Sequence, residues 1–282
     1  MVRGTWQQNA PLEGCFVIPF ESFVSKDNEV KKIKIERPEL IMKKKIKWSE
    51  LFNDNNFKYN TESKKLKNIT AYKLAKIIYP DLNQKKFKKI SNFIIKNIEI
   101  KKNNKLLDFG SGNGAFLFFL KNKVKKLYSL ELSKNFIKNQ KRFLQNTLYT
   151  LTNPYNVNFY KKIKDNYIDT TLSCSVFSYF YTESYCKNIL KEMIRTTSKQ
   201  IFIYDIKNKI KKGAFISTVR KRQKLTKKEY FNKYKYTPQR FYTKSFFINF
   251  LKKNYPKLKC KIINLPKEAT DSKFGFCLKI EK

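Results

Sequence analysis

Three alternate glycines have the clearest chemical meaning of any pattern in this sequence. Gly110, Gly112 and Gly114 follow the apolar run 105–109 in a chain that holds only seven glycines, whereas an average chain of this length would hold about 20. Alternate glycines after a strand let the backbone turn sharply and approach a ligand closely, and the helix that follows presents its N-terminus there. The segment predicts a ligand-binding turn between a strand and a helix.

Two carboxylates indicate which ligand this turn would bind. The phosphate-binding fingerprint of dinucleotide sites is G-x-G-x-x-G, but here the glycines stand at every second position and follow Asp108. A carboxylate at that point would repel a pyrophosphate and can pair with the ammonium group of a methionine moiety. Glu131 ends the next apolar run, where a carboxylate can accept two hydrogen bonds from ribose hydroxyls. The pattern favours a ligand with an amino group and a ribose.

These segments resemble the motifs of the class I S-adenosylmethionine-dependent methyltransferase family. Asp108-Phe-Gly110-Ser-Gly112-Asn-Gly114 is similar to the first family motif, Tyr128-Ser-Leu-Glu131-Leu-Ser133 to the second, and residues 165–179 to the fourth-strand motif. The resemblance covers about residues 84–282 and implies a methyltransferase with S-adenosylmethionine as cofactor. It implies these cofactor-binding residues: Asp108, Gly110, Ser111, Gly112, Asn113, Gly114, Glu131, Leu132, Cys174 and Ser175. Residues 189–195 and 201–205 resemble, more loosely, small-molecule and glycan-modifying members.

The residues expected to bind the adenine of S-adenosylmethionine depart from the family pattern. Members often place an acidic or amide residue just after the third strand, where it holds the adenine amine. Here the stretch at that expected place is Phe159-Tyr-Lys-Lys162. Backbone groups or stacking on Tyr160 are therefore expected to hold the adenine.

The elements that must position these residues alternate along the chain as short apolar runs and amphipathic helices, a pattern typical of a parallel sheet with crossover helices. Strands are expected at 105–109, 126–131, 156–160, 168–174, 200–206, 258–265 and 273–281, and helices at 71–78, 86–98, 112–122, 133–146, 182–197 and 243–254. The link between the last two strands is too short for a crossover, so they should pair antiparallel. The expected fold is α/β: a Rossmann-like, seven-stranded, mostly parallel sheet with an antiparallel C-terminal strand and a helical N-terminal cap.

The chain divides into three expected parts. Residues 1–41 hold six cations and six anions, so the whole net charge of +40 lies beyond them, and Met42 then opens a lysine run. We interpret 1–41 as an appended segment with Met42 as a natural start, or equally as an irregular N-terminal extension. Residues 42–100 would form the helical cap, and 101–282 the methyltransferase domain with an insertion at about 207–242.

The acceptor side offers fewer signals. The chain has no histidine, which excludes a histidine-based triad and the common zinc sites, so no metal-binding residue is predicted. Asp205 ends the fifth expected strand, at the edge where ligands bind, and is the candidate catalytic base for an acceptor hydroxyl. The aromatic stretch 230–242, which includes Arg240, forms either a lid over a sugar or packing beneath the insertion. Asn153-Pro-Tyr155 lacks the second proline of the base-methylating N-P-P-Y element and indicates only a turn.

The strong positive charge has two interpretations. Of 62 lysines and arginines only seven are arginine, although arginine suits bidentate phosphate and base contacts best. Lysine and asparagine enrichment is also what an AT-rich genome would encode, and we favour that interpretation over a polyanion-binding surface. The expected acceptor is therefore a small molecule or a saccharide precursor, as in surface polysaccharide assembly. RNA or protein methylation, and a binding module without chemistry, are the alternatives.

Composition also bears on the compartment. The longest apolar runs are far shorter than the roughly 20 residues that cross a bilayer, so no membrane span is expected. Five scattered cysteines without paired spacing favour a reducing cytoplasm over a disulfide scaffold.

Overall fold

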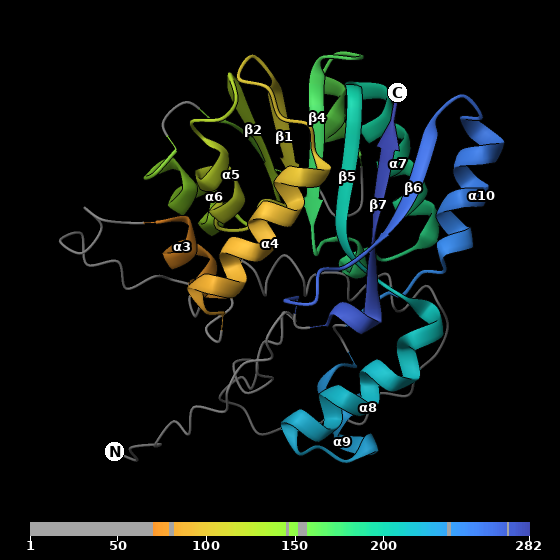
Figure 1. The fold of residues 1–282 in the computed structure, drawn as a ribbon. Coiled ribbons are helices and arrows are strands. Elements are labelled where there is room, and N and C mark those ends of the chain that lie inside the picture. Colours follow the sequence, from red (N-terminus) through yellow and green to blue (C-terminus); the bar gives the residue numbers. More distant parts are fainter. Residues whose placement is uncertain (1–69, 79–81, 145–146, 152–156, 236–237, 270) are drawn as a thin grey trace.

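The computed structural model describes residues 70–282 with the exception of 79–81, 145–146, 152–156, 236–237 and 270 (Figure 1). The expected appended segment 1–41, the Met42 start and most of the expected cap lie outside the described residues. The described part of the cap consists of helices α3 (Ala71–Ile78) and α4 (Gln84–Asn97).

A single mixed sheet forms the centre of the molecule, in the strand order β3-β2-β1-β4-β5-β7-β6. The strands are β1 (Lys105–Phe109), β2 (Lys126–Glu131), β3 (Thr147–Leu151), β4 (Ile168–Cys174), β5 (Thr197–Lys207), β6 (Lys259–Asn264) and β7 (Gly275–Glu281). β1 to β5 pair parallel with one another, and β7 lies antiparallel between β5 and β6. The predicted Rossmann-like α/β class and the antiparallel C-terminal strand are confirmed.

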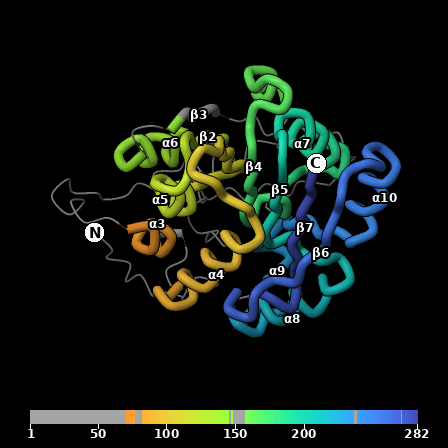
Figure 2. The backbone as a smooth tube through the Cα atoms, turned by 45° about the horizontal axis from the view of Figure 1, so that its top comes forward, coloured from red at the N-terminus to blue at the C-terminus, as the bar shows by residue number. Residues whose placement is uncertain are grey.

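Helices cover both faces of this sheet because its central strands are apolar on both sides. Leu106 of β1 packs in the cluster that contains Ile94 of α4, whereas the next residue, Leu107, packs in the cluster that contains Leu190 of α7 (Glu183–Thr196). Helix α5 (Ala115–Leu120) joins α4 on the first face, and α10 (Lys244–Asn254) joins α7 on the second. Figure 2 shows α3 and α6 (Lys134–Lys141) at one end of the sheet and α10 at the other. Among the described helices none is long and apolar enough to cross a membrane.

The third strand was predicted at the wrong place. The structure has β3 at Thr147–Leu151 and a 3-10 helix, η4, at Asn158–Lys162, whereas a strand was expected at 156–160 and a helix was expected to continue to 146. Phe159 and Tyr160 are both buried and both pack against Phe109, with ring centroids 6.3 and 6.1 Å away. Side chains of consecutive strand residues would point to opposite faces, so a turn is needed to bring both rings to one side.

The predicted insertion 207–242 is a helical unit beyond the end of β5 (Figure 1). It contains the 3-10 turn η6 (Lys209–Lys211) and helices α8 (Lys212–Gln223) and α9 (Lys227–Lys233), and its small core includes Phe215, Tyr230 and Phe241. Arg240 donates hydrogen bonds to backbone carbonyls, including that of Phe180 at 3.1 Å. The described aromatic residues therefore favour packing over a lid, although Phe231 is half exposed and Tyr236 lies outside the described residues.

Candidate functional site

The glycine turn has the geometry that its sequence predicts. Gly110, Gly112 and Gly114 have φ angles of 73°, 55° and 80°, in the left-handed region that favours glycine. A Cβ at Gly110 would lie 2.4 Å from Cγ2 of Val176, and one at Gly114 would lie 2.9 Å from Cγ of Gln140. The turn therefore accepts no larger residue at either place without displacing its neighbours.

A buried polar cluster fixes this turn to β2 and α6. The hydroxyls of Ser111 and Ser129 are 2.6 Å apart, and Gln140 donates to Ser111 Oγ and accepts from Ser129 Oγ, both at 2.9 Å. Gln140 is fully buried. No sequence motif marks Gln140, which lies in α6. The signal was a glutamine in an otherwise apolar stripe, because buried amides are nearly always hydrogen-bonded.

Glu131 joins the glycine turn to the end of β2. Its carboxylate accepts from the backbone N–H groups of Gly112 at 2.7 Å, Leu132 at 2.7 Å and Ser133 at 2.8 Å. Burial raises the pKa of Glu131 to about 7, and these three hydrogen bonds oppose the rise. A carboxylate offers about four acceptor positions, so three are occupied. One acceptor position of the carboxylate is left, so Glu131 can accept only one of the two hydrogen bonds from ribose hydroxyls that we predicted.

Asp108 carries a buried carboxylate oxygen that needs a partner. The side chain is 1% exposed, and Oδ1 has no hydrogen-bond partner in the described part of the chain. Burial raises the pKa of Asp108 to about 8, and the charge of Glu131 adds to the rise. Buried polar atoms are rarely left unpaired in native proteins, and an unpaired one has a functional or ligand-related reason. A cationic group entering the pocket would provide that partner and favour the charged carboxylate.

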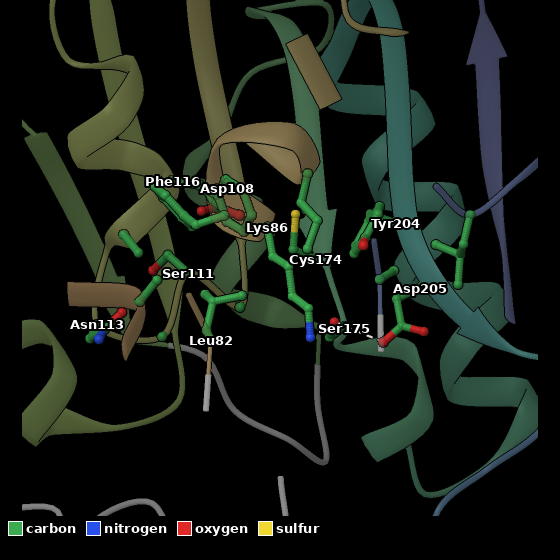
Figure 3. A pocket seen from close by; sticks show the side chains of 18 of the residues that line it. Leu82, Lys86, Asp108, Ser111, Asn113, Phe116, Cys174, Ser175, Tyr204 and Asp205 are labelled. Atoms are coloured by element: carbon green, nitrogen blue, oxygen red, sulfur yellow. Dashed lines mark hydrogen bonds between the residues drawn. The ribbon is translucent and has the colours of Figure 1, made fainter. Parts of the chain in front are cut away.

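One pocket connects the glycine turn with the carboxyl ends of β4 and β5. Most of the predicted site residues line it: Asp108, Gly110, Ser111, Gly112, Asn113, Cys174, Ser175 and Asp205. Figure 3 shows Ser111 and Asn113 on one side, Cys174, Ser175 and Asp205 on the other, and the Lys86 side chain between them. Gly114, Glu131 and Leu132 do not line the pocket; Glu131 supports the turn through the Gly112 N–H.

Helix α4 contributes pocket residues that the sequence patterns missed. Lys86, Phe87 and Ile90 line the pocket from this helix, and Tyr204 and Asp271 line it from the β5 and β7 side. No local motif marks them, because only the packing of α4 against the sheet brings them to the site. The signal available was the apolar face of the helix, which contains both Phe87 and Ile90.

Ser175, which follows β4, and Asp205, two residues before the end of β5, have unusual backbones at the pocket. Ser175 and Asp205 have φ angles of 57° and 61°, and the Ser175 hydroxyl donates to Asp205 Oδ2 at 2.9 Å. The pairing of β5 with β7 shifts register between Ile203 and Ile206, which flank Asp205. Such irregularities re-aim side chains and are concentrated at functional sites. Asp205 therefore lies where the sequence placed it, at the pocket end of β5.

Tyr160, expected to stack on the adenine, is wrongly assigned. It is fully buried, and its ring stacks on Phe109 with an interplanar angle of 13°. Because β3 ends at Leu151, the stretch after the third strand begins at 152, not 161. It includes Asn153 and Asn156, which lie outside the described residues together with the turn expected at 153–155. The apparent lack of an amide after the strand followed from the misplaced strand.

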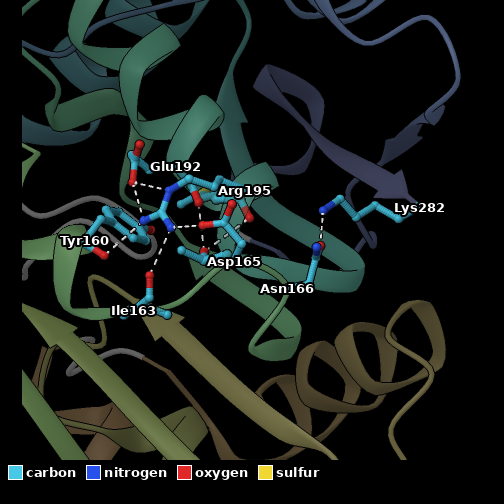
Figure 4. Close-up of polar contacts among 9 residues, drawn as sticks. Tyr160, Ile163, Asp165, Asn166, Glu192, Arg195 and Lys282 are labelled. Atoms are coloured by element: carbon cyan, nitrogen blue, oxygen red, sulfur yellow. Dashed lines mark hydrogen bonds and ion pairs between the residues drawn. The ribbon is translucent and has the colours of Figure 1, made fainter.

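The charged residues before β4 form a structural cluster. Arg195 of α7 donates to the carbonyls of Ile163 at 3.0 Å and Tyr160 at 3.1 Å, and it also pairs with Glu192 and Asp165 (Figure 4). These contacts tie the chain after η4 to the end of α7. Asp165 precedes β4, so the cluster lies at the end of the sheet where the parallel strands begin, and the pocket lies at the opposite end. The Asp165 part of the fourth-strand motif thus serves the fold.

Several solved structures with similar folds are methyltransferases. A Haemonchus contortus phosphoethanolamine N-methyltransferase with bound phosphoethanolamine and S-adenosylhomocysteine matches with a TM-score of 0.57 and 13% identity, covering 86% of this chain and 48% of that chain. A Synechocystis magnesium protoporphyrin IX methyltransferase with bound S-adenosylhomocysteine matches with a TM-score of 0.54 and 10% identity, covering 85% and 99%. At these identities the likeness establishes the fold. No curated protein sequence matches the chain.

The family model described as "Methyltransferase domain" matches residues 107–203. This range runs from β1 into β5 and contains the glycine turn, Glu131 and the end of β4. The match identifies residues 107–203 as a methyltransferase domain.

Replacing Glu131 by alanine should weaken cofactor binding. The variant loses the carboxylate that accepts from the Gly112 N–H and that is predicted to accept from a ribose hydroxyl, so we expect a loss of about 1–3 kcal/mol. Isothermal titration with S-adenosylhomocysteine measures it. The matched control is Glu99→Ala, which removes a glutamate whose side chain is 78% exposed. Equal affinities for the two variants would contradict a role for Glu131.

Proposed function

We propose that this protein transfers a methyl group from S-adenosylmethionine to a small molecule or a saccharide precursor. The observation that carries the proposal is the single pocket that joins Asp108 and the glycine turn to Ser175 and Asp205. Such a pocket accommodates the methyl donor at one end and a compact acceptor at the other. Surface polysaccharide assembly is a setting that would supply saccharide precursors.

The cofactor end of the pocket fits S-adenosylmethionine by its chemistry. Asp108 would receive the ammonium group of the methionine moiety, since its Oδ1 is buried and lacks a partner. The glycine turn allows the backbone to approach the ligand, and Glu131 would accept from a ribose hydroxyl. The cofactor supplies an electrophilic methyl group on its sulfonium.

At the acceptor end, Cys174 and Ser175 line the pocket at the end of β4, and Asp205 lines it at the end of β5. We propose that Asp205 accepts a hydrogen bond from the acceptor hydroxyl and takes up its proton when the methyl group is transferred, as a general base does. Ser175 orients Asp205 through the 2.9 Å hydrogen bond.

The distribution of lysines supports a small acceptor over a polyanion. Exposed lysines occur on α4, α6 and α10 as well as on α8, for example Lys88, Lys138, Lys253 and Lys221. Two basic residues near the pocket are paired with carboxylates: Lys207 is buried against Asp205 and Asp271, and Arg222 is 3.6 Å from Asp271. The pocket itself is lined by three aspartates and one lysine. These features fit a surface of dispersed, solvated lysines.

RNA or protein methylation is the second candidate function. The exposed lysines of η6 and α8, such as Lys209, Lys211 and Lys212, lie beyond the end of β5 and favour this second function.

A cytoplasmic setting fits both candidate functions, because the four described cysteines are all free.

A transfer assay with labelled cofactor distinguishes the candidates. The protein is incubated with methyl-labelled S-adenosylmethionine and with total RNA, or with pools of sugars and nucleotide sugars. We expect label in the small-molecule pools, and incorporation reduced at least about tenfold in Asp108→Asn, because the charged contact to the cofactor is lost. Label at a defined RNA position would contradict the small-molecule proposal.

A further inference from the structure

The acceptor end of the pocket is built around a buried lysine. Lys207 is 2% exposed, and its ammonium nitrogen lies 3.1 Å and 3.3 Å from the two carboxylate oxygens of Asp205. The same nitrogen lies 3.3 Å from Oδ2 of Asp271. Both aspartates line the pocket, whereas Lys207 does not. The ammonium group of Lys207 therefore holds the carboxylates of Asp205 and Asp271 close together without itself lining the pocket.

This arrangement is rigid. Asp205 is in the left-handed backbone region and also accepts from Ser175. A Cβ at Gly275 of β7 would lie 3.0 Å from Asp205 Oδ1 and 2.7 Å from Leu265 Cδ1. The side chain of Asp205 therefore packs directly over this glycine, where a residue with a side chain would collide with it. Arg222 of α8 lies 3.6 Å from Asp271 Oδ1. The carboxylates are thus held in place before any acceptor enters, as preorganised recognition requires.

Charge pairing within the cluster of Asp205, Asp271, Lys207 and Arg222 favours an uncharged acceptor group beside it. An anion would be placed beside two carboxylates and be repelled. An ammonium group would have to lie beside Lys207, which already occupies the position between the carboxylates, and two cations there would repel each other. The four charged groups, Asp205, Asp271, Lys207 and Arg222, sum to zero formal charge, so no net charge calls for a counterion.

A neutral hydrogen-bond donor meets neither objection. Asp205 uses three of its roughly four acceptor positions, for Ser175 and Lys207. The position that remains accepts a hydroxyl. We infer that Asp205 and Asp271, held by Lys207, form a subsite for the hydroxyl groups of a neutral polyhydroxy acceptor of the saccharide type. This inference rests on the proposed function and gives its acceptor a chemical class.

The test uses three hexoses that differ in one group: glucose, glucosamine and glucuronate. Saturation-transfer NMR measures each with protein saturated by S-adenosylhomocysteine, so that only the acceptor end is open. We expect glucose to bind and both charged sugars to bind at least about fivefold more weakly. Stronger or equal binding of a charged sugar would overturn the inference, as would the absence of binding by all three.

Variants separate the subsite from the cofactor site. Asp205→Asn keeps the shape and should reduce glucose binding at least about fivefold, with S-adenosylhomocysteine affinity retained. Lys207→Met should do the same, whereas Lys209→Met, which removes an exposed lysine two residues further on, should change neither. Because Lys207→Met can also impair folding, its melting temperature is compared with that of Asp205→Asn. Unaltered glucose binding in Asp205→Asn would overturn the subsite. If the unmodified protein did not bind S-adenosylhomocysteine, that result would instead contradict the proposed cofactor site.

Discussion

Replacing Gly110 by valine should abolish cofactor binding, with a loss of at least about 100-fold in affinity. Any Cβ there would lie 2.4 Å from Val176 Cγ2, and the φ of 73° is strained for a residue with a side chain, at roughly 1–2 kcal/mol. The side chain would also fill the space that the backbone leaves for the ligand. Isothermal titration with S-adenosylmethionine measures the loss.

Two controls separate loss of binding from loss of folding. Gly213→Val adds the same side chain where no atom lies within 4 Å of the new Cβ, so it should bind like the unmodified protein. The double variant Gly110→Ala with Val176→Ala removes the contacts with both Cγ atoms and leaves the one with Cβ at 3.2 Å, so it should recover part of the melting temperature without recovering full affinity. Normal affinity in Gly110→Val would show that the turn does not contact the cofactor.

Cofactor affinity should rise steeply with pH, up to about tenfold per unit between pH 6 and 8. The pKa of Asp108 is raised to about 8 by burial and by Glu131, so at pH 6 the carboxyl group must lose its proton before it can pair with the ligand ammonium. Above pH 8 the ligand amine begins to lose its own proton, which ends the rise. Titration calorimetry across this range gives the profile.

Asp108→Asn is the matched variant. It should flatten the part of the profile due to Asp108 and weaken binding at pH 8 by about 10–100-fold, the value of a charge-assisted hydrogen bond. Glu131, with its pKa raised to about 7, retains its own contribution. An unchanged, steep profile in Asp108→Asn would assign the pH dependence to another group.

The same raised pKa has an opposite effect on folding without ligand. A carboxyl group whose pKa rises on folding stabilises the folded state fully below its ordinary pKa of 3.8, and this stabilisation is lost as the pH rises through about 8. The ligand-free protein should therefore lose stability over that range, and Asp108→Asn should lose less. The fit between Asp108 and a cationic ligand is thus gained at the expense of stability.

The glycine turn and its two carboxylates could be predicted because their meaning is local. Positive φ angles at Gly110, Gly112 and Gly114 follow from residue type, and a carboxylate at the end of a parallel strand lies at the ligand edge of the sheet whatever surrounds it. The succession of strands and helices along the chain, apart from the third strand, followed from the alternation of apolar runs and amphipathic helices. These features depend on neighbours within a few residues.

The third strand and the acceptor end were decided by contacts between distant residues. Phe159 and Tyr160 have the composition of a strand, but packing on Phe109, 50 residues earlier, turns them into a 3-10 helix. Lys207 belongs to a lysine-rich segment that reads as surface, yet Asp271, 64 residues away, contributes to its burial as a paired cation. Sequence distance hides such pairs, because burial and charge pairing follow distance in space. Only the tertiary structure could therefore show that Asp205 and Asp271 lie together around Lys207.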